Sequence, residues 1–367
     1  MFERKTMIEY KKAEIGMVDD VAKLCNLVFR KTETPEHNDM HLQFPLMLSE
    51  ENAENLMVAV DGDRVVSHFG TSLTPMIIDG VEIPYGQIGA VCTHPDYRGQ
   101  GLGTKLLFNT FENFKANNVN IITISGGRGL YRRNGAVDLG CVGEFEIAPK
   151  EISHDGIQIE FYEGGEIGTE LIDLYNSEPS RYKRTATEFA MLMDAMPVSS
   201  FRPIAITAVA RIEGKPIAYV SGYHDTENNF KTVEFAGDVQ HILTLLSALA
   251  HKFRLDVHHA KISVQNIDAR YDYFLKNAKL VNMSNLPGAT FMVLNPKGLF
   301  DQLQPILEKR GLHKTYAELP LDLYCAYDDG IALARYLFGS FNIFYTGAED
   351  LKALPLMLPN PHSYNYI

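Results

Sequence analysis

The chain has 367 residues, of which 46% are hydrophobic and 22% charged, and its formal net charge is −12 at neutral pH. This length exceeds the usual size of one domain, so the sequence predicts two or more ordered domains with an ample core. The charge excludes a nucleic-acid-binding surface, because no basic cluster exceeds Arg128, Arg132 and Arg133. It favours cationic small molecules as ligands, although solubility alone explains it equally well.

The start of the chain and its cysteines indicate where the protein is expected to work. No run of about eighteen apolar residues occurs, and Met1 to Lys5 lacks the apolar segment of a signal peptide. We therefore expect a cytoplasmic protein without membrane contact. The cysteines are far apart and form no CxxC pair, which argues against a disulfide framework and against a zinc site. They are Cys25, Cys92, Cys141 and Cys325.

In chain order, the first elements predict a mixed α/β layout. Residues 8–10 form an expected edge strand, and the apolar spacing of Val21, Leu24 and Phe29 predicts a helix. Asp61-Gly62-Asp63 is a hairpin signal between two β-rich runs. The runs at 57–60 and 65–69 are followed by an expected strand at 85–92, a helix at 101–118, a strand at 121–125, a short helix at 130–134 and a strand at 137–142.

The segment His94 to Leu107 places a glycine-rich turn directly between a strand and a helix. Glycines at 99, 101 and 103 let the backbone bend tightly, so N–H groups can converge on one anion at the positive end of the helix dipole. The spacing excludes a P-loop and a dinucleotide fingerprint, both of which would need a glycine at Thr104. The turn predicts a pyrophosphate site, and a glycine-rich connection without a ligand is the alternative.

The pattern Arg98-Gly99-x-Gly101-x-Gly103 after a strand resembles the acetyl-CoA signature of the GCN5-related N-acetyltransferases, the GNAT superfamily. The resemblance implies a mixed α/β GNAT fold with a catalytic domain at residues 1–150, acetyl-CoA as co-substrate and no metal. It implies acetyl transfer by direct attack of a primary amine of a cationic small molecule or peptide. The expected cofactor-binding residues are Val91, Cys92, Thr93, Arg98, Gly99, Gln100, Gly101, Leu102, Gly103, Thr104, Gly126 and Gly127.

Tyr131 is the expected general acid. It lies in Gly129 to Gly135, at the start of a short helix, and in the family a tyrosine in this setting protonates the sulfur of coenzyme A. An unperturbed phenol has a pKa near ~10, so it is protonated at neutral pH and close to a thiol in acidity. The alternative is a tyrosine that only packs between two domains.

A second part of the chain repeats the first in pattern. Residues 208–220 match the earlier hairpin in spacing and turn position, which predicts a duplicated fold. The repeat continues through a strand at 232–236 and a helix at 239–253, but only Gly237-Asp238 separates them. We therefore expect residues 151–290 to form a degenerate GNAT-like domain that acts as a structural partner.

Residues 291–367 form an expected small C-terminal α/β section, with helices at 299–309 and 330–337. Leucines and prolines after residue 353 predict that the end of the chain packs against a surface. This order of parts, closing in Asn365-Tyr366-Ile367, resembles the Eis-like (enhanced intracellular survival) branch of the family. That resemblance implies a sterol-carrier-like section, a homo-oligomer, and a catalytic role in the acceptor site for the α-carboxylate of Ile367.

Other features are open to two interpretations. His37 and His41 have a spacing that could bind metal on a helix, but a polar loop beside the acceptor pocket explains them better because no third ligand is evident. His68 is expected to be a core histidine. The three arginines named above would touch cofactor phosphates or form a solvated face. An N-acetyltransferase is the leading function, while a non-catalytic acyl-CoA-binding regulator and a structural assembly protein stay open, although Tyr131 argues against both.

Overall fold

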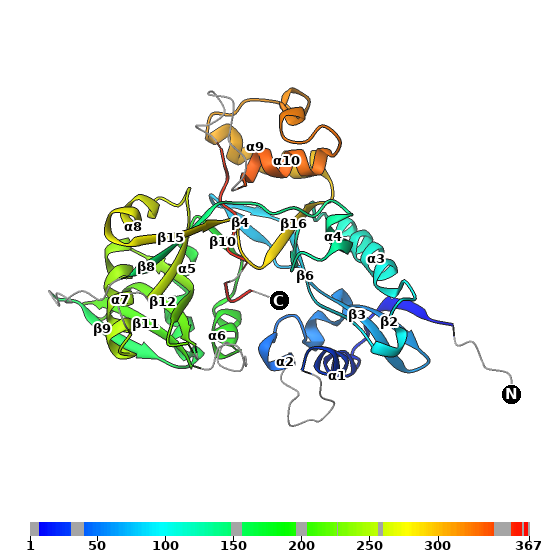
Figure 1. Ribbon diagram of the computed structural model, residues 1–367, viewed down its shortest axis with the longest axis horizontal. Helices are drawn as coiled ribbons and strands as arrows, with labels where there is room; N and C mark the ends of the chain where they lie inside the picture. The colour runs from blue at the N-terminus through cyan, green and yellow to red at the C-terminus, as the bar shows by residue number, and fades with distance from the viewer. Residues whose placement is uncertain are drawn as a thin grey trace.

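The computed structural model describes residues 7–30, 40–147, 156–195, 204–225, 227–255, 260–340, 354–361 and 363–365. Figure 1 shows two lobes, each built on a β-sheet, and a helical pair above the region where the lobes meet. The mixed α/β class expected from the sequence is confirmed. Within the described residues, none of the helices combines the length and the apolar character needed to cross a membrane.

The first lobe contains a six-stranded sheet with helices on both faces. Its elements are β1 Glu9–Lys12, α1 Val18–Phe29, α2 Met40–Gln43, a 3-10 turn Glu50–Asn55, β2 Met57–Asp61, β3 Arg64–Ser72, β6 Tyr85–Thr93, a 3-10 turn Pro95–Tyr97, α3 Leu102–Ala116, β7 Ile121–Ser125, α4 Gly129–Arg132 and β16 Ala289–Val293. The strand order is β1-β2-β3-β6-β7-β16, antiparallel throughout except for the parallel pair β6 and β7. Along β2, Met57 and Ala59 pack with α3 whereas Val58 and Val60 pack with α1, as the alternation of a strand requires.

The second lobe contains a seven-stranded sheet. Its elements are β8 Val142–Ile147, β9 Gln158–Tyr162, a 3-10 turn Gly165–Ile167, α5 Gly168–Asn176, α6 Ala186–Ala195, β11 Ile204–Ile212, β12 Lys215–His224, β13 Phe230–Gly237, α7 Val239–Lys252, β14 Ala260–Gln265, α8 Tyr271–Asn277 and β15 Lys279–Ser284. The strand order is β9-β11-β12-β13-β14-β8-β15, and only β13 and β14 are parallel. The run from β9 to β8 therefore repeats the strand directions of the first sheet from β1 to β16.

The two sheets exchange strands. β8 follows α4 of the first lobe in sequence but lies between β14 and β15 of the second, and β16 follows the second lobe but pairs with β7 of the first. The strand predicted at 137–142 is therefore wrong: Val137 forms only a bridge to Phe291, and the strand begins at Val142 in the other sheet. Alternating apolar residues predict a strand but not the sheet that it joins. The domain boundaries at residues 150 and 290 stay predictions. β8 ends before the first boundary but belongs to the second sheet, and β16 spans the second boundary but belongs to the first sheet.

A small sheet and the helical pair join the lobes. The hairpin β4 (Met76–Ile78) and β5 (Val81–Ile83) pairs with β10 (Ser180–Tyr182) of the second lobe. The pair is α9 (Pro296–Lys309) and α10 (Asp329–Phe338), which share one core cluster with the hairpin and confirm the two predicted C-terminal helices. Between them lie 3-10 turns at Tyr316–Glu318 and Leu321–Leu323. A sterol-carrier-like fold for this section stays a prediction.

The C-terminal segment, residues 354–361 and 363–365, returns from the helical pair into the space between the lobes, as the red trace in Figure 1 shows. The N–H of Leu356 donates to the carbonyl oxygen of Leu337 at 2.7 Å, and Leu354, Leu356 and Leu358 are buried in the cluster around α9 and α10. Tyr364, further along, packs in the core of the second lobe, with its ring 5.9 Å from that of Phe189. The expectation that the leucine-rich and proline-rich end packs against protein is confirmed for these residues.

Candidate active site

A β-bulge in β6 opens the first sheet. The parallel pairing of β6 with β7 joins Tyr85–Ile88 to Ile121–Ile124, whereas on the other edge the register with β3 shifts between His68 and Gly70. Ala90 has a φ of 47°, a left-handed conformation that is unusual outside glycine. The extra residue of a bulge bends its strand and leaves backbone groups unpaired, so Val91–Thr93 leave the line of β7.

The glycine turn, residues 98–104, connects β6 to α3 in the way the sequence predicted. Gly99 and Gly101 have φ values of 79° and 80°, and Gly101 is the N-cap of α3. The first helical hydrogen bond runs from the N–H of Lys105 to the carbonyl of Gly101, so the preceding N–H groups of the turn stay available to an anion. A Cβ at Gly99 or Gly101 would meet no atom within 4 Å, which leaves an open cradle of backbone.

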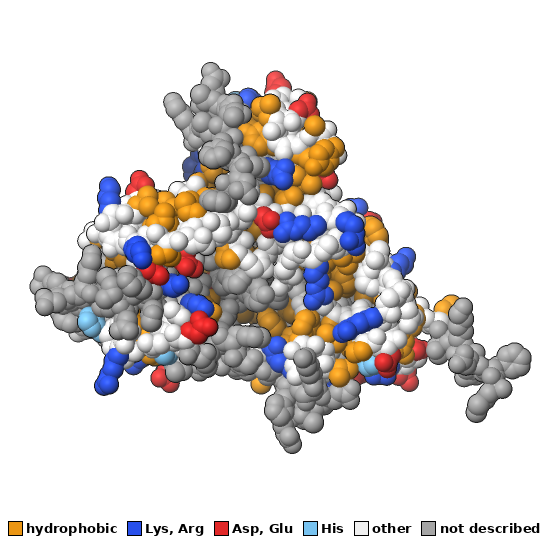
Figure 2. All heavy atoms as spheres, in the orientation of Figure 1, with side chains coloured by type: hydrophobic (Ala, Val, Ile, Leu, Met, Phe, Trp, Pro, Cys, Tyr) orange, Lys and Arg blue, Asp and Glu red, His pale blue; other side chains and the backbone are white. Residues whose placement is uncertain are grey.

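A cavity of about 410 Å³ lies between this turn, the bulge and α4. It brings together three groups of residues that the sequence predicted separately: Gly103 of the turn, Val91 to Thr93 of the bulge, and Tyr131. Figure 2 shows Lys and Arg side chains around the hollow on this face of the molecule. The complete lining is Val28, Phe69, Val91, Cys92, Thr93, Arg98, Gly103, Arg128, Leu130 and Tyr131.

The arginines predicted near the cofactor differ in their surroundings. Arg98 and Arg128 line the cavity, and their charges act to lower the pKa of Cys92, although the hydrogen bond with Cys25 and burial raise it well above its ordinary value. Arg132 donates to both carboxylate oxygens of Asp138 at 2.7 and 2.9 Å, so its charge is already paired. Arg133 is exposed and outside the lining. Of these arginines, Arg98 and Arg128 are therefore the two that line the cavity.

Tyr131 lies on α4 with its ring in the first-lobe core and only 2% of its surface exposed. The side chain also lines the cavity. Burial raises the pKa of Tyr131 to about 12, against a smaller opposing effect of Arg128. The phenol is therefore a weaker acid than the unperturbed value expected from the sequence, but it is firmly protonated at neutral pH.

The remaining predicted cofactor residues make different contributions. The side chain of Leu102 is buried in the core, while Gln100 and Thr104 are exposed on the turn. The N–H of Gly126 donates to the carbonyl of Gly288, and its own carbonyl accepts from Thr290, both at 3.0 Å. Gly126 and Gly127 lie outside the cavity lining, so the structure gives Gly126 a role in holding β16, and their cofactor role stays a prediction.

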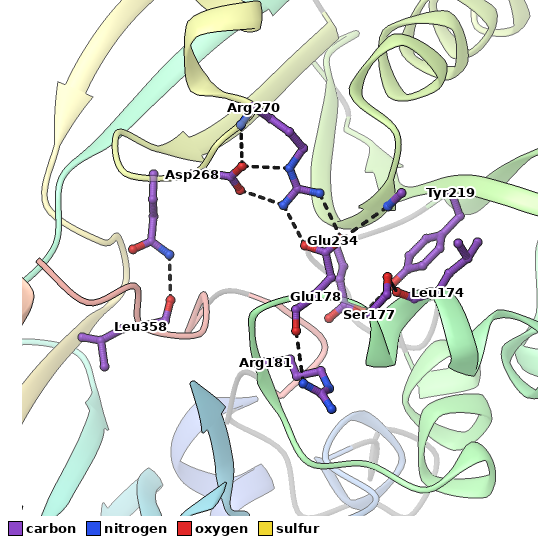
Figure 3. A network of polar contacts seen from close by, with 11 residues as sticks. Leu174, Ser177, Glu178, Arg181, Tyr219, Glu234, Asp268, Arg270 and Leu358 are labelled. Atoms are coloured by element: carbon purple, nitrogen blue, oxygen red, sulfur yellow. Dashed lines mark hydrogen bonds and ion pairs between the residues drawn. The ribbon is translucent and has the colours of Figure 1, made fainter. Parts of the chain in front are cut away.

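The second lobe closes the position that corresponds to this cavity. β13 and β14 pair only at Phe230–Lys231 and Ala260–Lys261, and a cavity of about 90 Å³ remains where they diverge. Figure 3 shows Arg270 in that region, between the carboxylates of Asp268 and Glu178. Its guanidinium donates to Glu178 at 2.7 and 3.0 Å and to Asp268 at 2.7 and 2.9 Å. Side chains therefore occupy the place that an anion turn would need.

The end of the described chain lies against the face of β6 opposite to Ile88. A cavity of about 20 Å³ there is lined by Ser72, Thr74 and Gln87 of the first lobe and by Tyr364 and Asn365. The guanidinium of Arg184 donates to Glu234 at 2.9 Å and to the Asn365 side chain at 2.5 Å. Sequence reasoning missed Gln87, Arg184 and Glu234. A polar residue inside the otherwise apolar strand at 85–92 was the signal available for Gln87.

Three predictions about other residues have different outcomes. Ile367 and His37 lie outside the described residues, so their roles stay predictions. Cys25 and Cys92, judged far apart from their separation of 67 residues, have Sγ atoms 3.8 Å apart because α1 packs on β6. None of the four cysteines forms a disulfide.

Comparison with known proteins found one family match and several solved structures of similar fold. The family described as Acetyltransferase (GNAT) domain matches residues 9–137. A GCN5-related N-acetyltransferase from Anabaena variabilis ATCC 29413 aligns with 15% identity and a TM-score of 0.61 over 81% of this chain and 75% of its own. A conserved protein of unknown function from Enterococcus faecalis V583 aligns with 16% identity and a TM-score of 0.63 over 81% of this chain and 75% of its own. Eis1 from Mycobacterium abscessus aligns with 9% identity and a TM-score of 0.55 over 79% of this chain and 74% of its own.

The comparison with curated proteins gave no match. At such low identities the solved structures show a shared fold, and the family match is confined to residues 9–137. The bulged strand, the glycine turn and the helix that follows it all fall inside the matched range. The part of the chain that carries the cavity therefore resembles the acetyltransferase (GNAT) domain family.

Proposed function

We propose that the protein transfers an acetyl group from acetyl-CoA to a primary amine. One observation carries the proposal: a single cavity is lined by the glycine turn, by the bulged residues of β6 and by Tyr131. The open cradle at Gly99 and Gly101 fits a pyrophosphate, because no side chain occupies the space in front of the backbone. Arg98 and Arg128 add positive charge at the same cavity.

The proposed mechanism assigns each step to residues of the first lobe. The N–H groups of residues 99–104 hold the pyrophosphate, and the N–H groups of Val91 and Thr93, beyond the pairing of β6 with β7, hold the thioester carbonyl and the pantetheine arm. Acetyl-CoA supplies the activated acetyl group. As the amine attacks and the C–S bond breaks, the hydroxyl of Tyr131 donates its proton to the departing sulfur. A pKa of about 12 keeps that proton available at every physiological pH.

The acceptor is proposed to approach from the side of Gln87 and Asn365. A cationic small molecule or a peptide amine suits the net charge of −12. The α-carboxylate of Ile367 is proposed to assist loss of the amine proton, which is supported by the burial of Tyr364 and Asn365 beside β6. A carboxylate there would favour cationic acceptors.

The second lobe is proposed to be a degenerate copy of the first, as in an Eis-like arrangement. The matching strand order and directions of the two sheets support this proposal. Asp238, whose side chain caps α7 by accepting from the N–H of Gln240 at 2.8 Å, stands where the first lobe has its glycine turn. Association into a homo-oligomer is a further proposal, which sedimentation of the full chain tests.

A thiol-release assay with a panel of amines tests the proposed function. Polyamines, aminoglycosides and lysine peptides are incubated with acetyl-CoA and the full chain, and free coenzyme A is measured over time. Amine-dependent release supports the transferase. Binding of acetyl-CoA without release from any amine would indicate the non-catalytic regulator instead, and absence of binding would leave a structural role.

A further inference from the structure

Three side chains with metal-binding atoms meet behind the bulge of β6. Cys25 comes from α1, His68 from β3 and Cys92 from β6. Cys25 and His68 are fully buried and Cys92 is 4% exposed. The cluster is a consequence of packing α1 against the bulged edge of the sheet, since the three residues are distant in sequence.

The distances within the cluster match those of a tetrahedral site. The Sγ atoms of Cys25 and Cys92 are 3.8 Å apart, Sγ of Cys25 lies 3.6 Å from Nδ1 of His68, and all three ligand atoms lie within 4.8 Å of one another. Zinc bonds of about 2.3 Å to sulfur and about 2.0 Å to nitrogen separate two sulfurs by about 3.8 Å and a sulfur from a nitrogen by about 3.6 Å. The Cys25–Cys92 and Cys25–His68 distances therefore match those of a tetrahedral zinc site.

A backbone carbonyl oxygen lies where a fourth ligand atom would be needed. The carbonyl of Ala90 lies 3.8 Å from Sγ of Cys25 and 3.3 Å from Nδ1 of His68. Ala90 is the residue with a φ of 47°, so a strained backbone position sits beside the cluster. We propose that Cys25, His68 and Cys92 bind Zn²⁺, with the carbonyl oxygen of Ala90 in the fourth position.

Two other interpretations of the cluster explain less. A disulfide needs an S–S distance of about 2.05 Å, so the sulfurs of Cys25 and Cys92 would have to approach substantially across two packed elements. Cysteines that serve only as small apolar residues do not account for Nδ1 of His68, which lies 3.6 Å from the Cys25 sulfur inside the core.

The site would connect to the proposed cofactor cavity. Cys92 lines that cavity, which gives an ion a path from solvent to the cluster. A bound ion would tie α1 and β3 to the bulge and stiffen Val91–Thr93. The proposal itself rests on the cluster and not on the acetyltransferase activity, so its test measures metal directly.

The full chain, reduced with a non-thiol reductant, is incubated with excess ZnCl₂, desalted and assayed for zinc. We expect about one zinc per chain. Cys25→Ser and Cys92→Ser should each lose this zinc, while the matched variants Cys141→Ser and Cys325→Ser should keep it. Absence of retained zinc in the parent chain, or full retention in Cys25→Ser, would overturn the proposal.

A second measurement does not depend on whether the variants fold. Co²⁺ added to the parent chain should produce intense thiolate-to-cobalt absorption that Zn²⁺ removes, as two cysteine ligands require. Cobalt bound without these bands would contradict the cluster as its site. A Cys25–Cys92 disulfide found by peptide mass mapping of the reduced and desalted chain would also overturn the metal assignment.

Discussion

Gln87 of β6 donates a hydrogen bond of 3.0 Å from its side-chain nitrogen to the carbonyl oxygen of Asn365, 278 residues later in the chain. The C-terminal segment is thereby fastened to the first lobe. From the other side Arg184, which is itself paired with Glu234, donates to the side chain of Asn365. Gln87 and Asn365 are both buried, so this hydrogen bond replaces bonds that the two groups would make to water in the unfolded chain. This contact connects the far end of the chain to the strand that carries the bulge.

Extending the chain after Ile367 should lower kcat by about 100-fold or more, because a displaced carboxylate can no longer assist loss of the amine proton. The affinity for acetyl-CoA should stay unchanged, since the cofactor cavity does not include the C-terminal segment. Steady-state kinetics and calorimetric titration measure the two effects. An extension of equal length before Met1 is the control, and a C-terminal extension with full turnover would remove Ile367 from the mechanism.

Gly103→Ala should weaken the binding of acetyl-CoA without harming the fold. The new Cβ would have the ring of Phe69 as its nearest neighbour, at an ordinary distance of 3.9 Å, but it would enter the cavity beside the helix N-terminus. We expect an unchanged or higher melting temperature, because alanine favours helix over glycine, and at least about a tenfold loss of affinity. Glu112→Ala, on the exposed side of the same helix, should bind normally. Unchanged affinity of Gly103→Ala would place the phosphate elsewhere.

Tyr131→Phe should lower kcat by about 100- to 10,000-fold with little change in cofactor affinity, because the ring stays and the transferable proton is lost. Burial raises the pKa of Tyr131 to about 12, so this group should cause no alkaline loss of activity in the parent between about pH 7 and about pH 10. Tyr327→Phe, at a residue that is 89% exposed, is the matched control. Turnover of Tyr131→Phe within a few-fold of the parent would exclude Tyr131 as the acid.

Calorimetric titration with acetyl-CoA should give one site per chain. The second lobe has Asp238 in place of the glycine turn, and Arg270 with its two carboxylates occupies the region where β13 and β14 diverge. Binding to the first lobe alone follows from these differences. Two equivalent sites would contradict the assignment of the second lobe as a degenerate copy.

Arg184→Met should lower the free energy of unfolding by about 3–5 kcal/mol, because it leaves the carboxylate of Glu234 buried without its partner. The two side chains are 1% and 8% exposed. Lys183→Met is the control, since Lys183 pairs with Glu82 on the surface and such pairs contribute about 0–1 kcal/mol. Urea unfolding of both variants measures the difference, and equal stabilities would show that the buried pair contributes nothing specific.

Several elements could be predicted from the sequence because their signals are local. Glycines at 99 and 101 have the positive φ values that their position in a tight turn suggested, and the helix after them begins at Leu102. The two hairpins and the missing turn of the second copy were likewise visible within short windows. Tyr131 was found from its motif, although its pKa depends on burial that no local pattern reveals.

Tertiary structure alone decided the contacts between distant segments. The exchange of β8 and β16, the contact of Gln87 with Asn365 and the meeting of Cys25 with Cys92 each join segments at least 67 residues apart. Local propensity and periodicity report on neighbouring residues and on which face is buried, not on which partner buries it. The sequence by itself therefore determined the glycine turn at residues 98–104 and the fold class of the first lobe. Packing between the lobes decided which residues surround the end of the described chain, and packing of α1 on β6 decided which residues surround the buried thiols.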